Sequence, residues 1–140
     1  MPRLLVAVDG SQHSDNATRF AIDLARRCGP AEIFVITVMP MLTGEVKTFI
    51  PKEMIDRYYQ EEGTKALASA RKLLDDAGLP YKHHIGVGTI GKAIVAYANE
   101  QRCDQIILGS RGHGAVVGLV LGSVATRVIA EASQPVTVVK

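Results

Sequence analysis

The chain has 140 residues, of which 47% are hydrophobic, and a formal net charge of +2. This length predicts a single domain over residues 1–140, with enough apolar side chains to build a core. The small charge and the lack of a Lys- and Arg-rich tract argue against a nucleic-acid partner, and no apolar run reaches the roughly 18 residues of a membrane span.

The first residues and the cysteines indicate a cytoplasmic protein. Met1-Pro2-Arg3 leads directly into an apolar run, without the pattern of a secretory signal. Cys28 and Cys103 lack the spacing of metal ligands, which predicts two reduced thiols. His83-His84 has no acidic residue beside it in the sequence, so we predict no metal site there.

The chain begins with a predicted strand, a turn and a helix. Leu4 to Val8 is a short unbroken apolar run, typical of a strand buried on both faces. Asp9-Gly10-Ser11 predicts a turn, and we expect Ser14 or Asp15 to cap the helix that follows. Gly29-Pro30 is expected to end it. The apolar positions of this helix follow a 3.6-residue period: Ala17, Phe20, Ala21, Leu24 and Ala25.

A second strand is predicted at Ile33 to Val38. The segment Met39 to Ile50 contains a proline and a glycine and has no clear period, so we expect a loop. Pro51 suits the first turn of a long helix, which we expect to end at Gly78-Leu79-Pro80.

The remaining chain continues the alternation of strands and helices. Strands are predicted at Tyr81 to Val87, Asp104 to Leu108 and Val136 to Val139. Helices are predicted at Thr89 to Arg102 and Val124 to Ala132. This order predicts an α/β, doubly wound parallel sheet with helices on both faces. Such sheets bind ligands beyond the carboxyl ends of their strands, where the strand order reverses.

One glycine segment matches two well-known nucleotide motifs incompletely. Gly86-Val87-Gly88-Thr89-Ile90-Gly91 reads as G-x-G-x-x-G, and with Lys92 it reads as G-x-x-x-x-G-K. The P-loop needs Ser or Thr next, where this chain has Ala93, and the dinucleotide motif needs an acidic residue that the next strand lacks. We therefore interpret the segment as a tight turn between strand and helix.

A second glycine pattern is more specific, because it fixes three glycines and a hydroxyl: Gly109-x-x-Gly112-x(9)-Gly122-Ser123. It follows a predicted strand and precedes a predicted helix. Glycine lets a ligand approach the backbone, and a helix N-terminus attracts anions, so the pattern predicts a site for nucleotide phosphates. The apolar segment Val116 to Leu121 is expected to pack under the nucleotide or against a partner subunit.

This pattern resembles the signature of the ATP-binding subgroup of the universal stress protein family. The opening Leu4 to Ser11 and the ending Ala125 to Lys140 resemble the family as well, so the resemblance spans the chain. It implies the adenine nucleotide alpha hydrolase-like arrangement, a five-stranded parallel sheet of order 3-2-1-4-5. It also implies a homodimer, and an adenine nucleotide in the crevice between strands one and four.

The resemblance assigns roles to individual residues. It places Asp9 at the ribose, Val38 at the adenine and Gly109 at the ribose and first phosphate. The phosphate loop and the helix start would hold the other phosphates through Gly112, Gly122, Ser123 and Val124. Arg111 and His113 are not fixed by the pattern; either could reach a phosphate or remain solvated. Asp9 could also be only a turn or capping residue.

The leading hypothesis is an ATP-binding stress-response or signalling module that acts by binding a partner, with Mg²⁺ or Mn²⁺ accompanying the phosphates. One alternative is slow ATP hydrolysis, for which His113 or Asp9 would have to serve as base. Another is a dimeric scaffold that binds no nucleotide. The last strand, Val136 to Val139, is expected to be an edge whose open backbone groups pair with a second copy.

Overall fold

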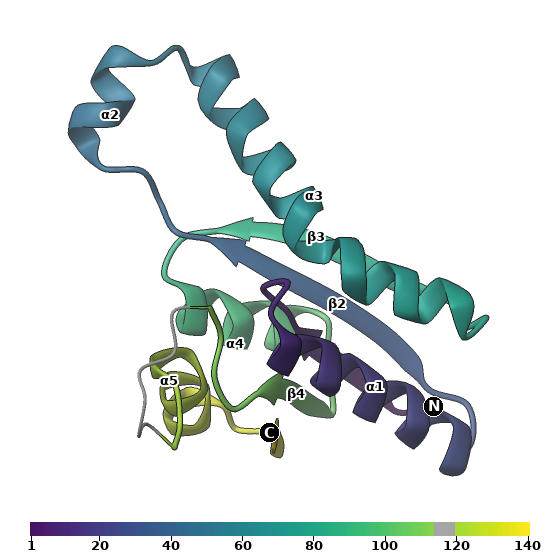
Figure 1. Cartoon of the computed structure of the whole chain (residues 1–140). Coiled ribbons are helices and arrows are strands. Elements are labelled where there is room, and N and C mark those ends of the chain that lie inside the picture. Colours follow the sequence, from purple (N-terminus) through teal and green to yellow (C-terminus); the bar gives the residue numbers. More distant parts are fainter. Residues whose placement is uncertain (114–119) are drawn as a thin grey trace.

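Five parallel strands form one sheet in the order β3-β2-β1-β4-β5, which confirms the expected order (Figure 1). The computed structural model describes residues 1–113 and 120–140, without the side chains of residues 46 and 47. Most of the segment Val116 to Leu121 therefore lies outside the described residues. The strands are β1 (Arg3–Ala7), β2 (Glu32–Met39), β3 (Tyr81–Val87), β4 (Gln105–Gly109) and β5 (Val136–Val139).

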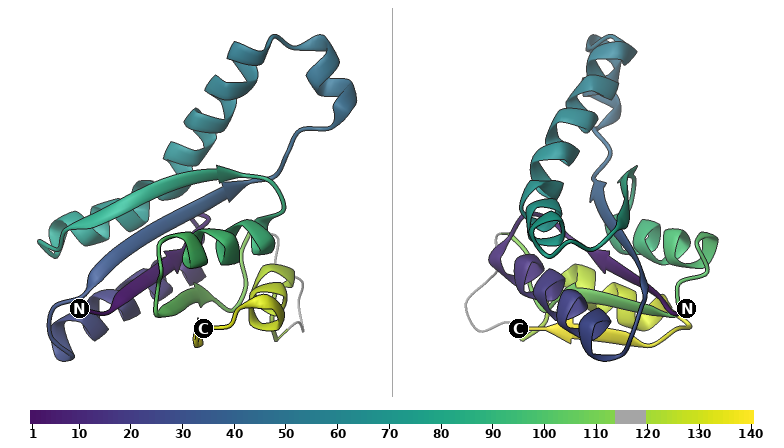
Figure 2. Two further views of the ribbon diagram at one scale, coloured as in Figure 1. Left: turned by 180° about the vertical axis from the view of Figure 1, so that it is seen from behind. Right: turned by 90° about the vertical axis from the view of Figure 1, so that its right-hand side faces the viewer.

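Helices cover both faces of the sheet, so the central strands are buried on both sides. Helices α1 and α3 pack on one face, and α4 and α5 pack on the other (Figure 2). In the part of the chain that is described, no helix is both long and apolar enough to span a membrane. The helices are α1 (Gln12–Arg27), α2 (Gly44–Phe49), α3 (Lys52–Asp76), α4 (Ile90–Glu100) and α5 (Ser123–Glu131).

The expected cap of the first helix is wrong by three or four positions, because α1 begins at Gln12 with Ser11 as its N-cap. The Ser11 hydroxyl accepts a hydrogen bond from the Ser14 N–H at 3.3 Å. Asp15 instead accepts a bond from the hydroxyl of Ser69 at 2.6 Å, which connects α1 to α3. The turn after β1 is therefore shorter than expected, and it brings the start of α1 close to the end of the sheet.

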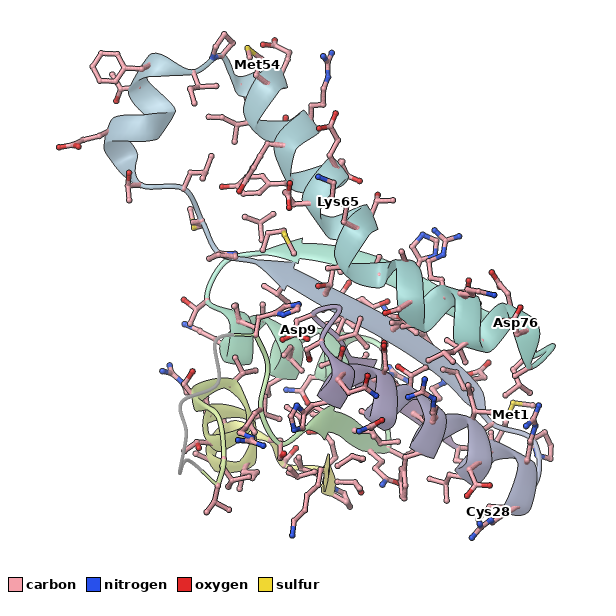
Figure 3. All side chains as sticks on the ribbon, viewed as in Figure 1. Met1, Asp9, Cys28, Met54, Lys65 and Asp76 are labelled. Atoms are coloured by element: carbon pink, nitrogen blue, oxygen red, sulfur yellow. The ribbon has the colours of Figure 1, made fainter. Side chains whose placement is uncertain are left out.

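The expected loop from Met39 to Ile50 is also wrong, because it contains the short helix α2. Six residues are too few for a helical period to show in the sequence. The helix and the first turns of α3 project beyond the sheet, and Met54 lies at their far end (Figures 1 and 3). The Leu42 N–H donates to the buried Tyr59 hydroxyl at 2.9 Å, which connects this projection to α3.

Two of the three glycines in the incomplete nucleotide motif have structural explanations. A Cβ on Gly91 would lie only 2.7 Å from Cγ of Arg127, because α4 and α5 pack closely there. Gly88 has a φ of +145°, a backbone conformation that favours glycine. Helix packing and turn geometry thus account for both residues.

Candidate functional site

A hollow of about 590 Å³ lies at the carboxyl ends of β1, β2 and β4. Strand β1 pairs with β2 on one side and β4 on the other, so this is the point where the strand order reverses. All nine residues that the sequence pointed to line this pocket: Asp9, Val38, Gly109, Arg111, Gly112, His113, Gly122, Ser123 and Val124. The fold therefore brings together residues that are far apart in the sequence.

The inner part of the pocket is an apolar slot. Strands β2 and β4 contribute Ile36, Val38 and Leu108, and α4 contributes Ile90 and Ile94. All of these side chains except the half-buried Ile90 are buried. A slot of this kind can hold a planar ring away from water.

Sequence reasoning missed most of this slot. Ile36 lies two residues before Val38, so the two share one face of the strand. Ile90 and Ile94 are four residues apart, so they share one face of α4. Both spacings are visible in the sequence, but they do not show which face meets the crevice.

Asp9 lies just beyond β1, near the carboxyl end of the sheet (Figure 3). One carboxylate oxygen accepts the Ser11 N–H at 2.9 Å, and the other accepts the His113 N–H at 3.1 Å. Burial alone would raise the pKa of Asp9, but the hydrogen bonds from Ser11 and His113 outweigh it, so the pKa is lowered. The pocket thus contains an ionised carboxylate at neutral pH.

The segment after β4, residues 110–113, lies tightly against Asp9, and we call it the glycine loop. A Cβ on Gly112 would collide with Oδ2 of Asp9, so a larger residue would push the carboxylate away. The His113 ring also contacts Asp9, with Nε2 at 2.9 Å from the Asp9 carbonyl oxygen. Gly112 is needed here for close approach to Asp9.

The N-terminus of α5 forms another wall of the pocket. Gly122 is its N-cap and offers no side chain, and no described side chain caps the first turn. The N–H groups of Ser123 and Val124 belong to that first turn, which has no intrahelical acceptor for them. Contrary to expectation, the N–H of Gly122 is already used, because it donates to the Ser110 carbonyl at 2.7 Å. The backbone donors left at the start of this helix are therefore those of the residues after Gly122.

Arg111 is the cationic side chain of the loop. Its guanidinium lies 3.5 Å from Nε2 of His13 in the first turn of α1. Arg111 takes part in none of the ion pairs found among the described residues. The described residues also include no cluster of three or more His, Cys, Asp or Glu side chains that could hold a metal ion.

These features define an α/β protein whose pocket combines an apolar slot, a carboxylate and an uncapped helix N-terminus. The sequence pattern of the universal stress protein family matches residues 1–140. The universal stress protein MJ0531 of Methanocaldococcus jannaschii is 31% identical over 144 aligned positions, which cover 99% of this chain and 81% of that protein. The chain belongs to the universal stress protein family.

Two solved structures extend the comparison. The structure of MJ0577, also from Methanocaldococcus jannaschii, has a TM-score of 0.85 and 27% identity, and the match covers 99% of this chain and 95% of that one. A universal stress protein of Archaeoglobus fulgidus in complex with dAMP has a TM-score of 0.67 and 28% identity, with coverage of 100% and 98%.

Proposed function

We propose that this protein binds ATP in the pocket between β1 and β4, and that nucleotide occupancy changes how it binds a partner in a stress response. The observation that carries the proposal is one hollow of about 590 Å³ that joins an apolar slot, the Asp9 carboxylate and the start of α5. These surfaces match the three chemical parts of a nucleotide: a planar base, a ribose with hydroxyl groups and an anionic phosphate chain.

The proposed orientation places each part of ATP against a matching surface. Adenine lies in the slot beside Val38, and the ribose hydroxyls donate to Asp9 near Gly109. The phosphates accept bonds from the first-turn N–H groups and the hydroxyl of Ser123, with Arg111 as a cationic neighbour. The dAMP complex of the Archaeoglobus fulgidus relative supports an adenine nucleotide as the ligand class.

Mg²⁺ or Mn²⁺ would enter already bound to the phosphates. Asp9 is the one carboxylate among the described residues that line the pocket, and both of its oxygens accept protein N–H groups. The protein therefore offers a metal ion little beyond the nucleotide's own oxygens.

Thermal unfolding of nucleotide-stripped protein, with and without ATP and Mg²⁺, tests this proposal. Ligand at about 100 times its Kd should stabilise the fold by roughly 2.7 kcal/mol, which is a readable rise in midpoint. Gly112→Ala should lose most of the rise, because the new Cβ displaces Asp9. Gly44→Ala is the matched control, because its Cβ would meet nothing within 4 Å. No rise in the parent protein would contradict the proposal.

We further propose a homodimer through the open edge of β5. The other edge strand, β3, carries Lys82, His83 and His84, and such residues protect an edge from pairing. Strand β5 has the sequence Val-Thr-Val-Val and no charge. Sedimentation should therefore give a dimer mass for the parent and a monomer mass for Thr137→Lys. A monomeric parent would refute the dimer.

Both cysteines are free thiols in the structure. This supports the cytoplasm as the proposed location, because thiols are kept reduced there.

A further inference from the structure

Two hydrogen bonds connect Asp9 and His113 in opposite directions. The backbone N–H of His113 donates to the Asp9 carboxylate at 3.1 Å, and the His113 ring contacts the Asp9 carbonyl oxygen at 2.9 Å. A carbonyl oxygen can only accept, so Nε2 of His113 must carry the proton. We call this pair of bonds the clasp. It joins the end of β1 to the glycine loop across 104 positions of sequence.

The surrounding backbone leaves room for the clasp. Gly10 has a φ of +84°, and a Cβ there would lie 3.6 Å from Nε2 of His113. A larger residue at this position would be strained by its φ, while its Cβ would make an ordinary contact with the ring. Gly112 approaches the Asp9 carboxylate so closely that a Cβ would collide with it. Glycines on both sides of the clasp therefore allow the two segments to meet.

We propose that the clasp holds the glycine loop in its binding position before nucleotide arrives, so that His113 is a positioning residue rather than a ligand of the phosphates. This inference rests on the proposed nucleotide site. The N–H of the His113 ring is occupied by the Asp9 carbonyl oxygen, and in this tautomer Nδ1 has no proton to donate to a phosphate. A carboxylate can accept about four hydrogen bonds, so Asp9 retains capacity for the ribose hydroxyls after the two bonds it already accepts.

A loop that is already ordered increases affinity, because nucleotide binding then carries no entropy cost of ordering the loop. Removing the ring bond should therefore weaken ATP binding by about three- to tenfold, the range expected for one hydrogen bond. Most of the change should lie in the dissociation rate.

The test compares His113→Ala, His113→Asn and His113→Gln. The amide nitrogen of glutamine can take the place of Nε2, whereas that of asparagine is too short to reach the Asp9 carbonyl. We expect the Ala and Asn variants to bind ATP more weakly and the Gln variant to bind like the parent. Hydrogen exchange without nucleotide is the second measurement: the backbone amide at position 113, which donates to the Asp9 carboxylate, should exchange faster in the Ala and Asn variants only.

Arg111→Ala is the comparison that separates positioning from direct contact. It should weaken ATP binding without changing amide exchange in the nucleotide-free protein. Weaker binding in all three His113 variants, with unchanged exchange, would mean that the ring contacts phosphate and would overturn the clasp. Unchanged affinity and exchange in the Ala and Asn variants would also overturn it. If the parent binds no ATP, the proposed function fails, and the exchange comparison still decides whether the clasp holds the loop.

Discussion

Helix α1 lies very close to the sheet at Gly109, the last residue of β4. A Cβ on Gly109 would lie 2.7 Å from Cβ, 2.8 Å from C and 2.9 Å from O of His13. Two of these atoms are backbone atoms in the first turn of a helix, so no side-chain rotation can make room. Carbon atoms pack best at about 3.5–4.0 Å, so Gly109→Ala should force α1 away from β4.

The expected cost follows from this overpacking, which typically destabilises a protein by about 1–3 kcal/mol. Gly86→Ala is the matched control, because Gly86 is also a strand glycine and its Cβ would meet Cγ2 of Val38 at an ordinary 3.5 Å. Alanine should stabilise that position slightly, by roughly 0.5 kcal/mol, because it restricts the unfolded chain.

Urea unfolding of the parent and both variants measures the difference. With a slope of about 2 kcal/mol/M, Gly109→Ala should lower the midpoint by roughly 0.5–1.5 M, while Gly86→Ala leaves it unchanged or slightly raised. Equal midpoints for the two variants would refute the reasoning, because they would show that α1 is not held against Gly109.

Three further predictions concern other parts of the chain. Burial raises the pKa of Cys103 to about 11, so a thiol reagent at pH 8 should label the exposed Cys28 and reach Cys103 only after unfolding; rapid labelling of both would contradict this. The pKa of Asp9 is lowered by folding, so the stability it contributes is present at neutral pH and lost as pH falls below about 4. The unfolding free energies of the parent and Asp9→Asn should therefore converge in acid, and a pH-independent difference would be the contrary result. Tyr59→Phe removes the acceptor of the Leu42 N–H, so it should cost about 1 kcal/mol and speed proteolysis within residues 40–50, an effect that Tyr58→Phe should not share.

The sequence could predict the sheet because its central strands are unbroken apolar runs, such as Leu4 to Val8, between glycine and proline signals. The strand order is implied only by the family resemblance, since local patterns do not show which strands pair. Helix α2 could not be predicted, because it spans only six residues. The sequence cannot assign the N-cap of α1, because Ser11, Ser14 and Asp15 are all good capping residues and only the backbone geometry decides among them.

The pocket, too, could be predicted from the sequence only in part. Its glycines and its carboxylate could be found from their positions after strands and before a helix. The bond from the Gly122 N–H to Ser110 and the clasp between Asp9 and His113 could not, because both depend on the path of the loop in space. Sequence could therefore name the residues of the candidate site, but it could not say which of their polar groups remain free for a ligand.

The most direct test of the proposed ATP site is the change in backbone amide NMR signals when ATP and Mg²⁺ are added to nucleotide-free protein. We predict the largest shifts at Asp9, at Gly109 to His113 and at Ser123 to Ala125, around the pocket between β1 and β4. Another hollow, of about 310 Å³, lies between α1 and α3 near Arg26, and the amide signals around it should not shift. Shifts confined to that hollow, or no shifts with ATP in large excess, would contradict the account.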